Sequence, residues 1–400
     1  MTANIYFPAL NPIAHDLGVS VSLINLTLTT YMIFQGIAPT MFGDFGDMAG
    51  RRPAIIVAVL IYIVANLGLA LQNNFAALLI LLGNGSVTPT GFNMTAIAWV
   101  SQKRRQRKQQ KEGGGAPSVV VQLNEDGSVR QKPKLRFPNP LRALAVVFDK
   151  GVGLVILYNS LLYLMFITTV ATLSTQFKEK YGYDDLEIGL CYLPYGAGCF
   201  AAAIGQGYML DWYYRRIAKK IGFSIDKKRG DDLSNFPIEK ARIVPLYFFV
   251  AVGIVAVIIY GWVLELRSSV AAPLCLHFII GLCITGSFGI LNTLIVDLSP
   301  EAPATAVAAN NFVRCEMGAA ATAVIDLMIS GMGTGWCFTF FALLGVVFMP
   351  ILWAEGKYGI QWRQEKRLRR EKKLNEKRDR KERKETEKAA AAVQRETQQE

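Results

Sequence analysis

The side chains of this chain that are best suited to chemistry lie inside long apolar stretches. The stretch at 307–330 carries two amides, a guanidinium group and two carboxyl groups, namely Asn310, Asn311, Arg314, Glu316 and Asp326. Asn310 and Arg314 are four residues apart, so they share one face of a helix. Polar groups are costly to bury in apolar surroundings, and they therefore mark places where a solute, a proton or an ion is handled.

Two further stretches combine aromatic rings with amides. Tyr31 and Gln35 are four residues apart in the stretch at 22–42, and a second set lies in 152–174: Tyr158, Asn159 and Tyr163. With Asn310 and Asn311 these residues form the candidate substrate-binding set. A cavity lined by aromatic rings and amides with few charges suits bulky amphipathic or cationic compounds. The alternative for each tyrosine is a place in the aromatic belt at a membrane surface.

The charged residues inside these stretches allow two interpretations. Arg314 can form a structural ion pair, with Asp297 or Asp326 as its partner, or it can contact a solute. Glu316 and Asp326 are the only carboxylates well inside the apolar stretches that follow residue 150. Each of them is therefore a candidate proton carrier.

Other kinds of chemistry have little support. All six cysteines lie in apolar stretches without C-x-x-C spacing, and the chain has only two histidines, His15 and His277. These features argue against a disulfide framework, a metal site and a Ser-His-Asp arrangement. The glycines at 113–115 are not followed by the Lys-Ser/Thr of a phosphate-binding loop. We expect no enzyme activity, no cofactor, no metal and no nucleic-acid partner.

The elements that must position these side chains are transmembrane helices. Apolar stretches of 18 to 26 residues occur at eight places: 22–42, 54–71, 152–174, 188–210, 244–264, 271–296, 307–330 and 334–353. An α-helix needs about 20 such residues to cross the bilayer core. The sequence therefore predicts an all-α, polytopic membrane protein.

Basic residues predict the orientation of these helices. Of the 43 Lys and Arg residues, 39 fall in four segments: 51–52, 103–150, 215–242 and 357–395. Because Lys and Arg are enriched on the cytoplasmic side, we expect all four segments, including the charged C-terminal tail, to be cytoplasmic. The tail has many opposite charges four residues apart, which favours an exposed helix that is attracted to anionic lipid.

An internal repeat divides the chain into two halves. The pattern Gly-x3-Asp-x3-Arg-Arg occurs twice, 164 residues apart, with Gly43, Gly46, Asp47, Gly50, Arg51 and Arg52 in the first copy and Gly207, Asp211, Arg215 and Arg216 in the second. Duplicated halves are known among transporters. We expect each glycine to let two helices approach at a turn and each Asp to cap the next helix, so that the motif gates the cytoplasmic mouth. The alternative is a loop that only sets the topology.

The first copy of this motif, from Gly43 to Pro53, resembles the loop between helices two and three of the major facilitator superfamily. Four further segments resemble its fungal drug:proton antiporter branch: NIYFPAL at 4–10, NTLIVD at 292–297, AANNFVRC at 308–315 and GWCFTF at 335–340. The resemblance runs to about residue 365. It implies a twelve-helix transporter of two halves that alternates between inward- and outward-open states and is usually driven by protons.

The first half is shorter than this pattern requires. It shows an apolar stub at 1–14, two clear stretches and an apolar start at 75–82, after which Gly83 to Pro89 resembles the family's central loop. Most of helix four and all of helices five and six are expected to be absent. The expected fold is a major facilitator-type two-half bundle with about 9–10 spans instead of 12, in which the polar segment 75–100 crosses poorly.

These observations predict four parts of the chain. They are a truncated N-terminal transmembrane half at 1–100, a central cytoplasmic loop at 101–150, a C-terminal six-helix half at 151–355 and a cytoplasmic tail at 356–400. The expected function is efflux of a drug or another amphipathic or cationic small molecule by alternating access, coupled to protons, from a monomer in the plasma membrane. The alternative is a transport-inactive remnant or faulty gene model that acts at most as a membrane interaction partner.

Overall fold

The computed structural model describes residues 21–48, 51–71, 141–222, 236–300 and 303–397, and the regular structure in these ranges is helical. The helices are α2 (Val21–Met48), α3 (Arg51–Leu71), α5 (Leu141–Val147), α6 (Lys150–Tyr181), α7 (Asp185–Cys191), α8 (Leu193–Ile221), α9 (Ile238–Glu265), α10 (Ala271–Leu298), α11 (Pro303–Met332), α12 (Thr334–Val347) and α13 (Pro350–Thr397). The segments 1–14 and 75–100, on which the predicted span count partly depends, lie outside the described residues.

Several of these helices have the dimensions of membrane spans. Within the described residues, five helical segments are long and apolar enough to cross a membrane: Lys150–Tyr181, Asp185–Ile221, Ile238–Glu265, Ala271–Leu298 and Thr334–Arg369. α2 and α11 are of similar length, with 28 and 30 residues. All of these exceed the ~20 residues that a helix needs to cross the bilayer core.

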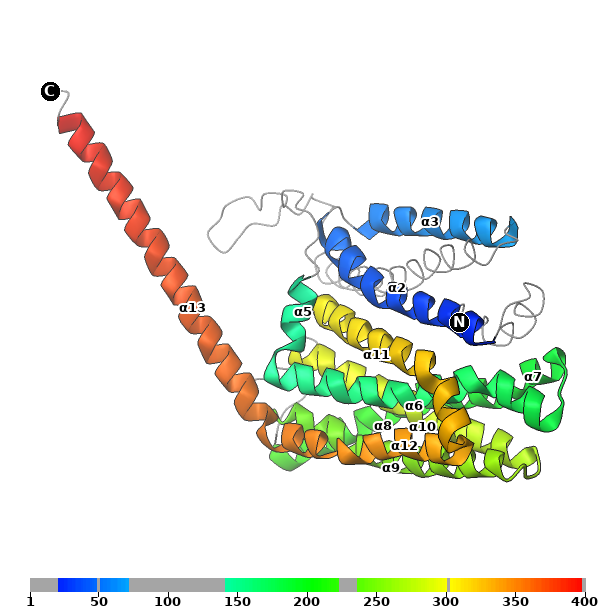
Figure 1. Ribbon diagram of the computed structural model, residues 1–400. Helices are drawn as coiled ribbons and strands as arrows, with labels where there is room; N and C mark the ends of the chain where they lie inside the picture. The colour runs from blue at the N-terminus through cyan, green and yellow to red at the C-terminus, as the bar shows by residue number, and fades with distance from the viewer. Residues whose placement is uncertain (1–20, 49–50, 72–140, 223–235, 301–302, 398–400) are drawn as a thin grey trace, which may run out of the picture.

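The helices from α6 onward form one bundle in which the long helices run side by side (Figure 1). α6 is its central element, with buried residues along its length from Gly151 to Phe177 and contacts with α10, α11, α12 and α13. A helix that is apolar on all sides belongs in such a buried position. We call the end of the bundle from which α13 departs the tail end, and the opposite end the far end. α13 continues away from the bundle as one helix, so the boundary predicted at 355 falls inside it.

α8 and α10 pack backbone against backbone. A Cβ atom on Gly198 would lie 2.2 Å from the carbonyl oxygen of Phe278, and one on Gly281 would lie 2.5 Å from that of Tyr195. Only glycine allows this separation, and small residues of this kind are the usual basis of helix association in membranes. The other face of α8 is exposed over most of its length.

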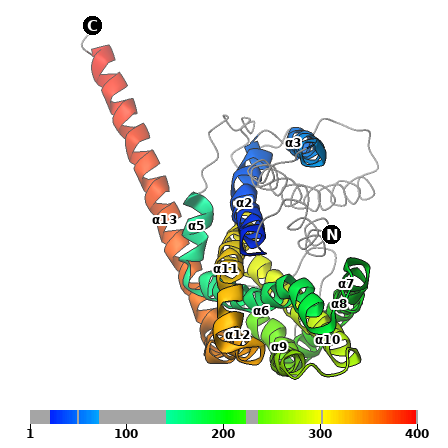
Figure 2. The ribbon, with the colours of Figure 1, turned by 45° about the vertical axis from the view of Figure 1, so that its right-hand side comes forward.

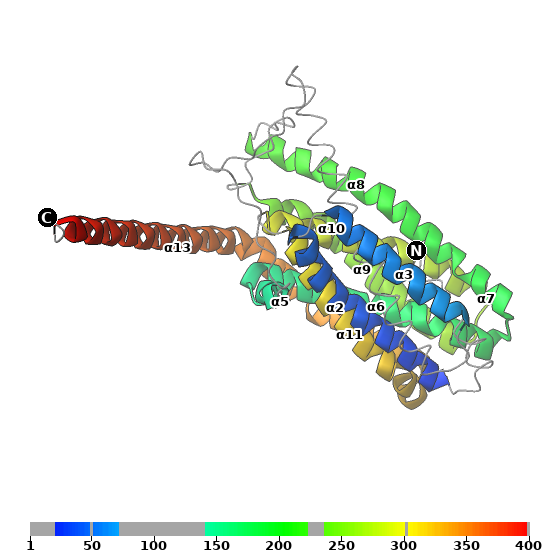
Figure 3. The ribbon, with the colours of Figure 1, turned by 90° about the horizontal axis from the view of Figure 1, so that it is seen from above.

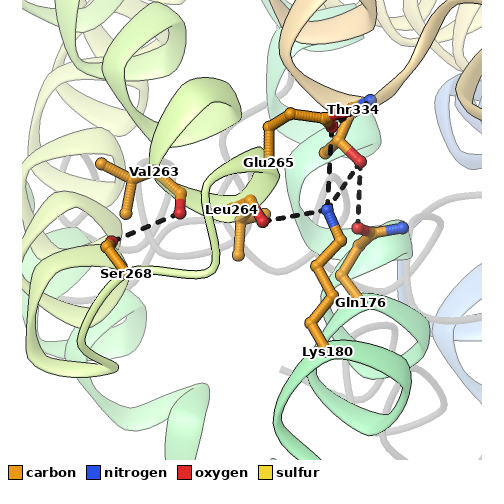
Figure 4. A network of polar contacts seen from close by, with 7 residues as sticks. All are labelled: Gln176, Lys180, Val263, Leu264, Glu265, Ser268 and Thr334. Atoms are coloured by element: carbon orange, nitrogen blue, oxygen red, sulfur yellow. Dashed lines mark hydrogen bonds and ion pairs between the residues drawn. The ribbon is translucent and has the colours of Figure 1, made fainter.

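A polar network joins three helices at the far end (Figure 4). The Lys180 ammonium on α6 donates to the Leu264 carbonyl (3.0 Å) and to the Thr334 hydroxyl (2.9 Å). Thr334 in turn donates from its hydroxyl to Gln176 (3.2 Å) and from its backbone N–H to the Glu265 carboxylate (2.9 Å). The network satisfies the buried polar atoms of Lys180 and Thr334 and fixes α6, α9 and α12 relative to one another.

The first half contacts the second chiefly where α2 lies along α11 (Figures 2 and 3). A Cβ atom on Gly36 would lie 3.1 Å from a side chain of α11, and one on Gly318 would lie 2.5 Å from the Met32 side chain. The hydroxyls of Thr29 and Thr322 are 3.3 Å apart across the same interface. We call this contact the α2–α11 seam; α3 lies outside it, against α2.

The first copy of the repeated motif does not form the expected loop. α2 continues through Gly43, Gly46 and Asp47 to Met48, and α3 begins at Arg51 and Arg52, because the helical pattern does not stop at the first glycine. Gly50 and the side chains of this copy lie outside the described part of the chain. Its gating role stays a prediction.

The second copy lies wholly inside α8. Asp211 is paired with Arg215 one turn later (3.8 Å), and the guanidinium of Arg216 lies 5.1 Å from the centre of the Trp212 ring. A Cβ atom on Gly207 would meet no atom of the described residues within 4 Å. The expected role of Asp211 in capping the next helix is wrong, because α8 continues without a turn to Ile221. The role of Gly207 in close helix approach stays a prediction.

We expect Gly198→Ala to destabilise the bundle, because its methyl group would overlap the Phe278 carbonyl oxygen. Overpacking of this kind typically costs about 1–3 kcal/mol. Gly205→Ala is the matched control, since it lies on the same helix and a Cβ atom there would meet nothing described within 4 Å. Thermal unfolding of the purified protein in detergent should show a lower Tm for Gly198→Ala only. Equal Tm changes in the two variants would contradict the close α8–α10 packing.

Candidate functional site

A cavity of about 260 Å³ lies between α2 and the helices of the second half. Its lining comes from α2, α6, α8, α10 and α11: Leu28, Tyr31, Met32, Gln35, Tyr163, Phe166, Ile167, Tyr195, Cys199, Thr285, Phe288 and Arg314. Three predicted substrate-binding residues, Tyr31, Gln35 and Tyr163, are among them. The four-residue spacing of Tyr31 and Gln35 places both on the face of α2 that looks into this cavity.

One wall of the cavity is aromatic. The ring of Phe166 lies 5.2 Å from that of Tyr163, 5.8 Å from that of Tyr195 and 6.1 Å from that of Phe288, centre to centre. These tilted and edge-on arrangements are the favourable ones for aromatic pairs. The wall offers a rigid apolar surface for the body of a small molecule.

Among the described residues of the lining, Arg314 is the charged one. Its guanidinium lies 4.9 Å from the centre of the Tyr163 ring and donates a short hydrogen bond to the Asn311 side-chain oxygen. Its Nε is buried and has no hydrogen-bond partner among the described residues. Within the same residues no carboxylate lies at ion-pair distance from it. The guanidinium therefore has donor capacity left for a ligand in the cavity.

The amides predicted to contact substrate instead connect the helices behind the cavity. Asn159 donates to the side-chain oxygen of Asn310 (2.8 Å), and Asn310 donates to that of Asn292 (2.9 Å), which links α6, α11 and α10. Asn311 donates to the Gln35 carbonyl across the α2–α11 seam (2.9 Å). Asn159, Asn310 and Asn311 are buried, and their amide N–H groups find acceptors within the protein, as polar groups in a low-dielectric interior need.

Tyr158 lies outside the cavity lining. Its hydroxyl donates to the Gly345 carbonyl (3.2 Å), and its side chain is fully buried against α12. Tyr158 and Tyr163 are five residues apart, which rotates their side chains about 140° around a helix. Tyr158, which the sequence predicted to bind substrate, therefore does not share the cavity face of α6 with Tyr163.

The carboxylates considered as partners of Arg314 lie elsewhere. Asp297 accepts a hydrogen bond from the Arg242 guanidinium at the tail end (3.1 Å). Glu316 faces the α2–α11 seam, with one carboxylate oxygen 3.2 Å from the position of a Cβ atom on Gly36. Asp326 is half-buried further along α11. The proposed pair of Arg314 with Asp297 is wrong, because the partner of Asp297 is 55 residues away on α9.

Several lining residues carry no signal in the sequence. Phe166, Tyr195 and Phe288 are apolar or aromatic residues in apolar stretches, and Cys199 and Thr285 are small ones; Thr285 donates to the Cys199 thiol (3.1 Å). Cys199 lies four residues after Tyr195, so it could be predicted to line the cavity once Tyr195 is known to do so. Nothing in the sequence identifies Phe288 without the packing of α10 on α6.

The family model of the Major Facilitator Superfamily matches residues 1–109 and 94–323. The chain belongs to the Major Facilitator Superfamily. As a member of this superfamily it is a multi-pass membrane protein that transports small molecules and is not an enzyme.

Curated relatives support the same assignment. MFS-type transporter phiD of a fungal species is 32% identical over 91% of this chain and 67% of its own length. MFS-type transporter clz19 of Cochliobolus lunatus is 31% identical over 90% of this chain and 81% of its own, and Citrate exporter 1 of Aspergillus niger is 27% identical over 94% and 86%. Among solved structures, the human organic anion transporter MFSD10 aligns with a TM-score of 0.56 at 14% identity, covering 87% of this chain and 89% of its own. This last likeness shows the fold.

Single-cysteine variants should distinguish the cavity from the core. A variant that retains only Cys199 is expected to react with a water-soluble thiol reagent, because this thiol lines the cavity, whereas one that retains only Cys283 should resist, because Cys283 is fully buried. Mass spectrometry of the reconstituted protein after timed labelling measures both rates. Equal rates for the two variants would show that water does not reach the cavity.

Proposed function

We propose that this protein exports a small organic anion with an apolar body, such as a carboxylic acid. The cavity offers an aromatic wall to the body and the Arg314 guanidinium to the carboxylate. The single observation that carries the proposal is the buried Nε of Arg314, which has no hydrogen-bond partner among the described residues. A buried donor on a cation gains most from an anionic acceptor, because charge-assisted hydrogen bonds are the strong ones.

This proposal changes the substrate expected from the sequence. The aromatic rings and amides alone favoured a drug or another amphipathic or cationic compound as the substrate. With Arg314 as the one charged group in the lining, a cationic solute would be repelled unless it carried its own counter-ion. The relative named Citrate exporter 1 supports an anionic substrate and supports export as the direction.

We further propose that transport is coupled to protons through Glu316. One oxygen of this carboxylate is buried with no hydrogen-bond partner among the described residues, and it faces Gly36 across the α2–α11 seam. A seam between halves opens and closes as a two-half transporter rocks around its binding site. A carboxylate there meets water in one state and apolar neighbours in the other, so its proton can be exchanged between them.

The remaining expectations complete this proposal. The clustering of Lys and Arg supports a cytoplasmic tail end, and hence an intracellular position for α13, in a monomer of the plasma membrane. For the first copy of the Gly-x3-Asp-x3-Arg-Arg motif, we also propose the expected role in gating the cytoplasmic mouth.

A transport-inactive role has one specific observation in its favour. The alignment with phiD extends over 456 positions, more than the 400 residues of this chain, so part of that relative has no counterpart here. A chain without some first-half helices would have an incomplete barrier on one side of the cavity. In that case the protein would act as a membrane interaction partner, and reconstitution would give no transport at all.

Arg314→Met is expected to raise the KM for a carboxylate substrate about ten- to hundredfold, because a hydrogen bond to a charged group contributes about 1.5–3 kcal/mol. Arg314→Lys should keep part of the affinity, since it keeps the charge but not the guanidinium geometry. Arg267→Met, the same change at an exposed far-end position, is the control. Initial rates of transport of an aromatic carboxylate such as benzoate in proteoliposomes give the KM values. An unchanged KM in Arg314→Met would contradict the proposed role.

Glu316→Gln is expected to abolish the dependence of transport on a pH gradient while leaving substrate exchange intact, because the amide cannot carry the proton. Asp326→Asn tests the second carboxylate of α11 in the same way. Flux measured with and without a pH gradient in proteoliposomes separates coupled transport from exchange. If both variants keep the wild-type pH dependence, neither carboxylate carries the proton.

A further inference from the structure

The tail end of the bundle holds a cluster of charged side chains that is separate from the cavity. It lies where α13 begins against α6 and α9, close to the end of α10, and contains four carboxyl groups and three cations: Asp149, Glu239, Asp297, Glu355, Arg242, Arg363 and Lys366. The number of carboxyl groups exceeds the number of cations. The cluster also joins the start of α13 to the bundle.

Three of the four carboxylates have a cation. The Arg242 guanidinium lies 3.1 Å from Asp297, and the Arg363 guanidinium lies 3.4 Å from Glu239. Lys366 contacts Asp149. Arg363 also donates to the Phe236 carbonyl (2.7 Å), which fixes its position next to Glu239.

Glu355 is the carboxylate that remains. Its side chain is fully buried, and neither oxygen has a hydrogen-bond partner among the described residues. No cation of these residues lies within ion-pair distance of it. The effective cost of burying an unpaired ion is several kcal/mol, so a charged Glu355 does not suit this position.

The surroundings of Glu355 leave little space for another ligand. One of its oxygens would lie 3.3 Å from a Cβ atom on Gly151 and 3.0 Å from one on Gly359. The buried Glu239 side chain approaches the same position on Gly359 to 2.8 Å, so the two glutamates flank this glycine. Among the described residues no group of three potential ligands could hold a metal ion. The smallest ligand that neutralises a carboxylate here is a proton.

We propose that Glu355 is a proton-binding site, and that its proton holds residues 350–366, the root of α13, against α6 and α9. The neutral carboxyl avoids the cost of an unpaired charge and the repulsion from Glu239 and Asp149. When the proton leaves, both costs appear, and separation of the root from the bundle relieves them by exposing Glu355 to water. The docked root is therefore stable at low pH and is released as the pH rises. This inference does not depend on the substrate or on transport.

Infrared spectroscopy of the reconstituted protein tests the proton directly. The protonated carboxyl of Glu355 contributes a carboxylic-acid C=O band at neutral pH, and Glu355→Gln is expected to remove it. Glu265→Gln is the matched control, because Glu265 lies at the far end beside Lys180 and accepts a hydrogen bond from the Thr334 N–H. The band should persist in that variant. If the difference between the wild-type and Glu355→Gln spectra shows no carboxylic-acid C=O band, the proposal is overturned.

Hydrogen exchange measures the docking of the root in the unmodified protein. The exchange rates of peptides covering 350–366 are measured from about pH 5 to about pH 9, and each rate is divided by the intrinsic rate at that pH. This range includes the documented pKa values of buried glutamates. Because Glu355 holds its proton more tightly when the root is docked, protection is expected to fall by up to about tenfold per pH unit between the pKa of the exposed carboxyl and that of the buried one. Above the latter pKa, protection should level off. Peptides from the far ends of α9 and α10 should show no such fall.

Two variants separate Glu355 from a general effect of pH. Glu355→Gln should keep the root protected over the whole range, because the amide imitates the protonated acid. Glu239→Gln should reduce the loss of protection at high pH, because it removes the nearest negative charge and frees Arg363 to stabilise a charged Glu355 in the docked root. Constant protection in the wild type, or a parallel fall in the wild type and Glu355→Gln, would overturn the proposal.

Discussion

The burial of polar and charged groups among packed helices is the constraint on which this structure depends. Water is scarce inside such a bundle, so each buried polar group needs a partner from the protein itself. The amides of α6, α10 and α11 bond in series, and the far-end network around Lys180 joins three helices. Among the described residues, the buried charged groups outside these arrangements include the Nε of Arg314, one oxygen of Glu316 and the carboxylate of Glu355. Each exception marks a place where we infer a ligand.

Close helix packing is a second constraint on this structure. Glycines on α8 and α10 bring two backbones together, Gly36 lets α2 approach α11 closely, and Gly318 leaves room for the Met32 and Tyr163 side chains. The α2–α11 seam therefore places Tyr31 and Gln35 of the first half opposite Tyr163 and Arg314 of the second. An organic anion in the cavity would contact both halves, as alternating access requires.

Much of the fold could be predicted from the sequence, and part of the site could not. Apolar length alone located the helices from α6 to α12, because a span needs about 20 apolar residues. Four-residue spacing found Tyr31 and Gln35, and the cost of burying a guanidinium singled out Arg314. The five-residue spacing of Tyr158 and Tyr163 separates their side chains around α6, but which of the two faces the cavity depends on the helices that pack there. The pairing of Asp297 with Arg242 and the isolation of Glu355 depend on contacts between distant segments, which no local pattern encodes.

The central claim is that the one charged group of the cavity selects anions. Its most direct test is accumulation of radiolabelled benzoate in proteoliposomes that contain the purified protein and are preloaded with the unlabelled compound. A labelled organic amine of similar size, such as benzylamine, is compared in the same way. The account predicts rapid exchange of the labelled anion above the rate of protein-free liposomes and no such exchange of the amine. Exchange of the amine without exchange of the anion would contradict it.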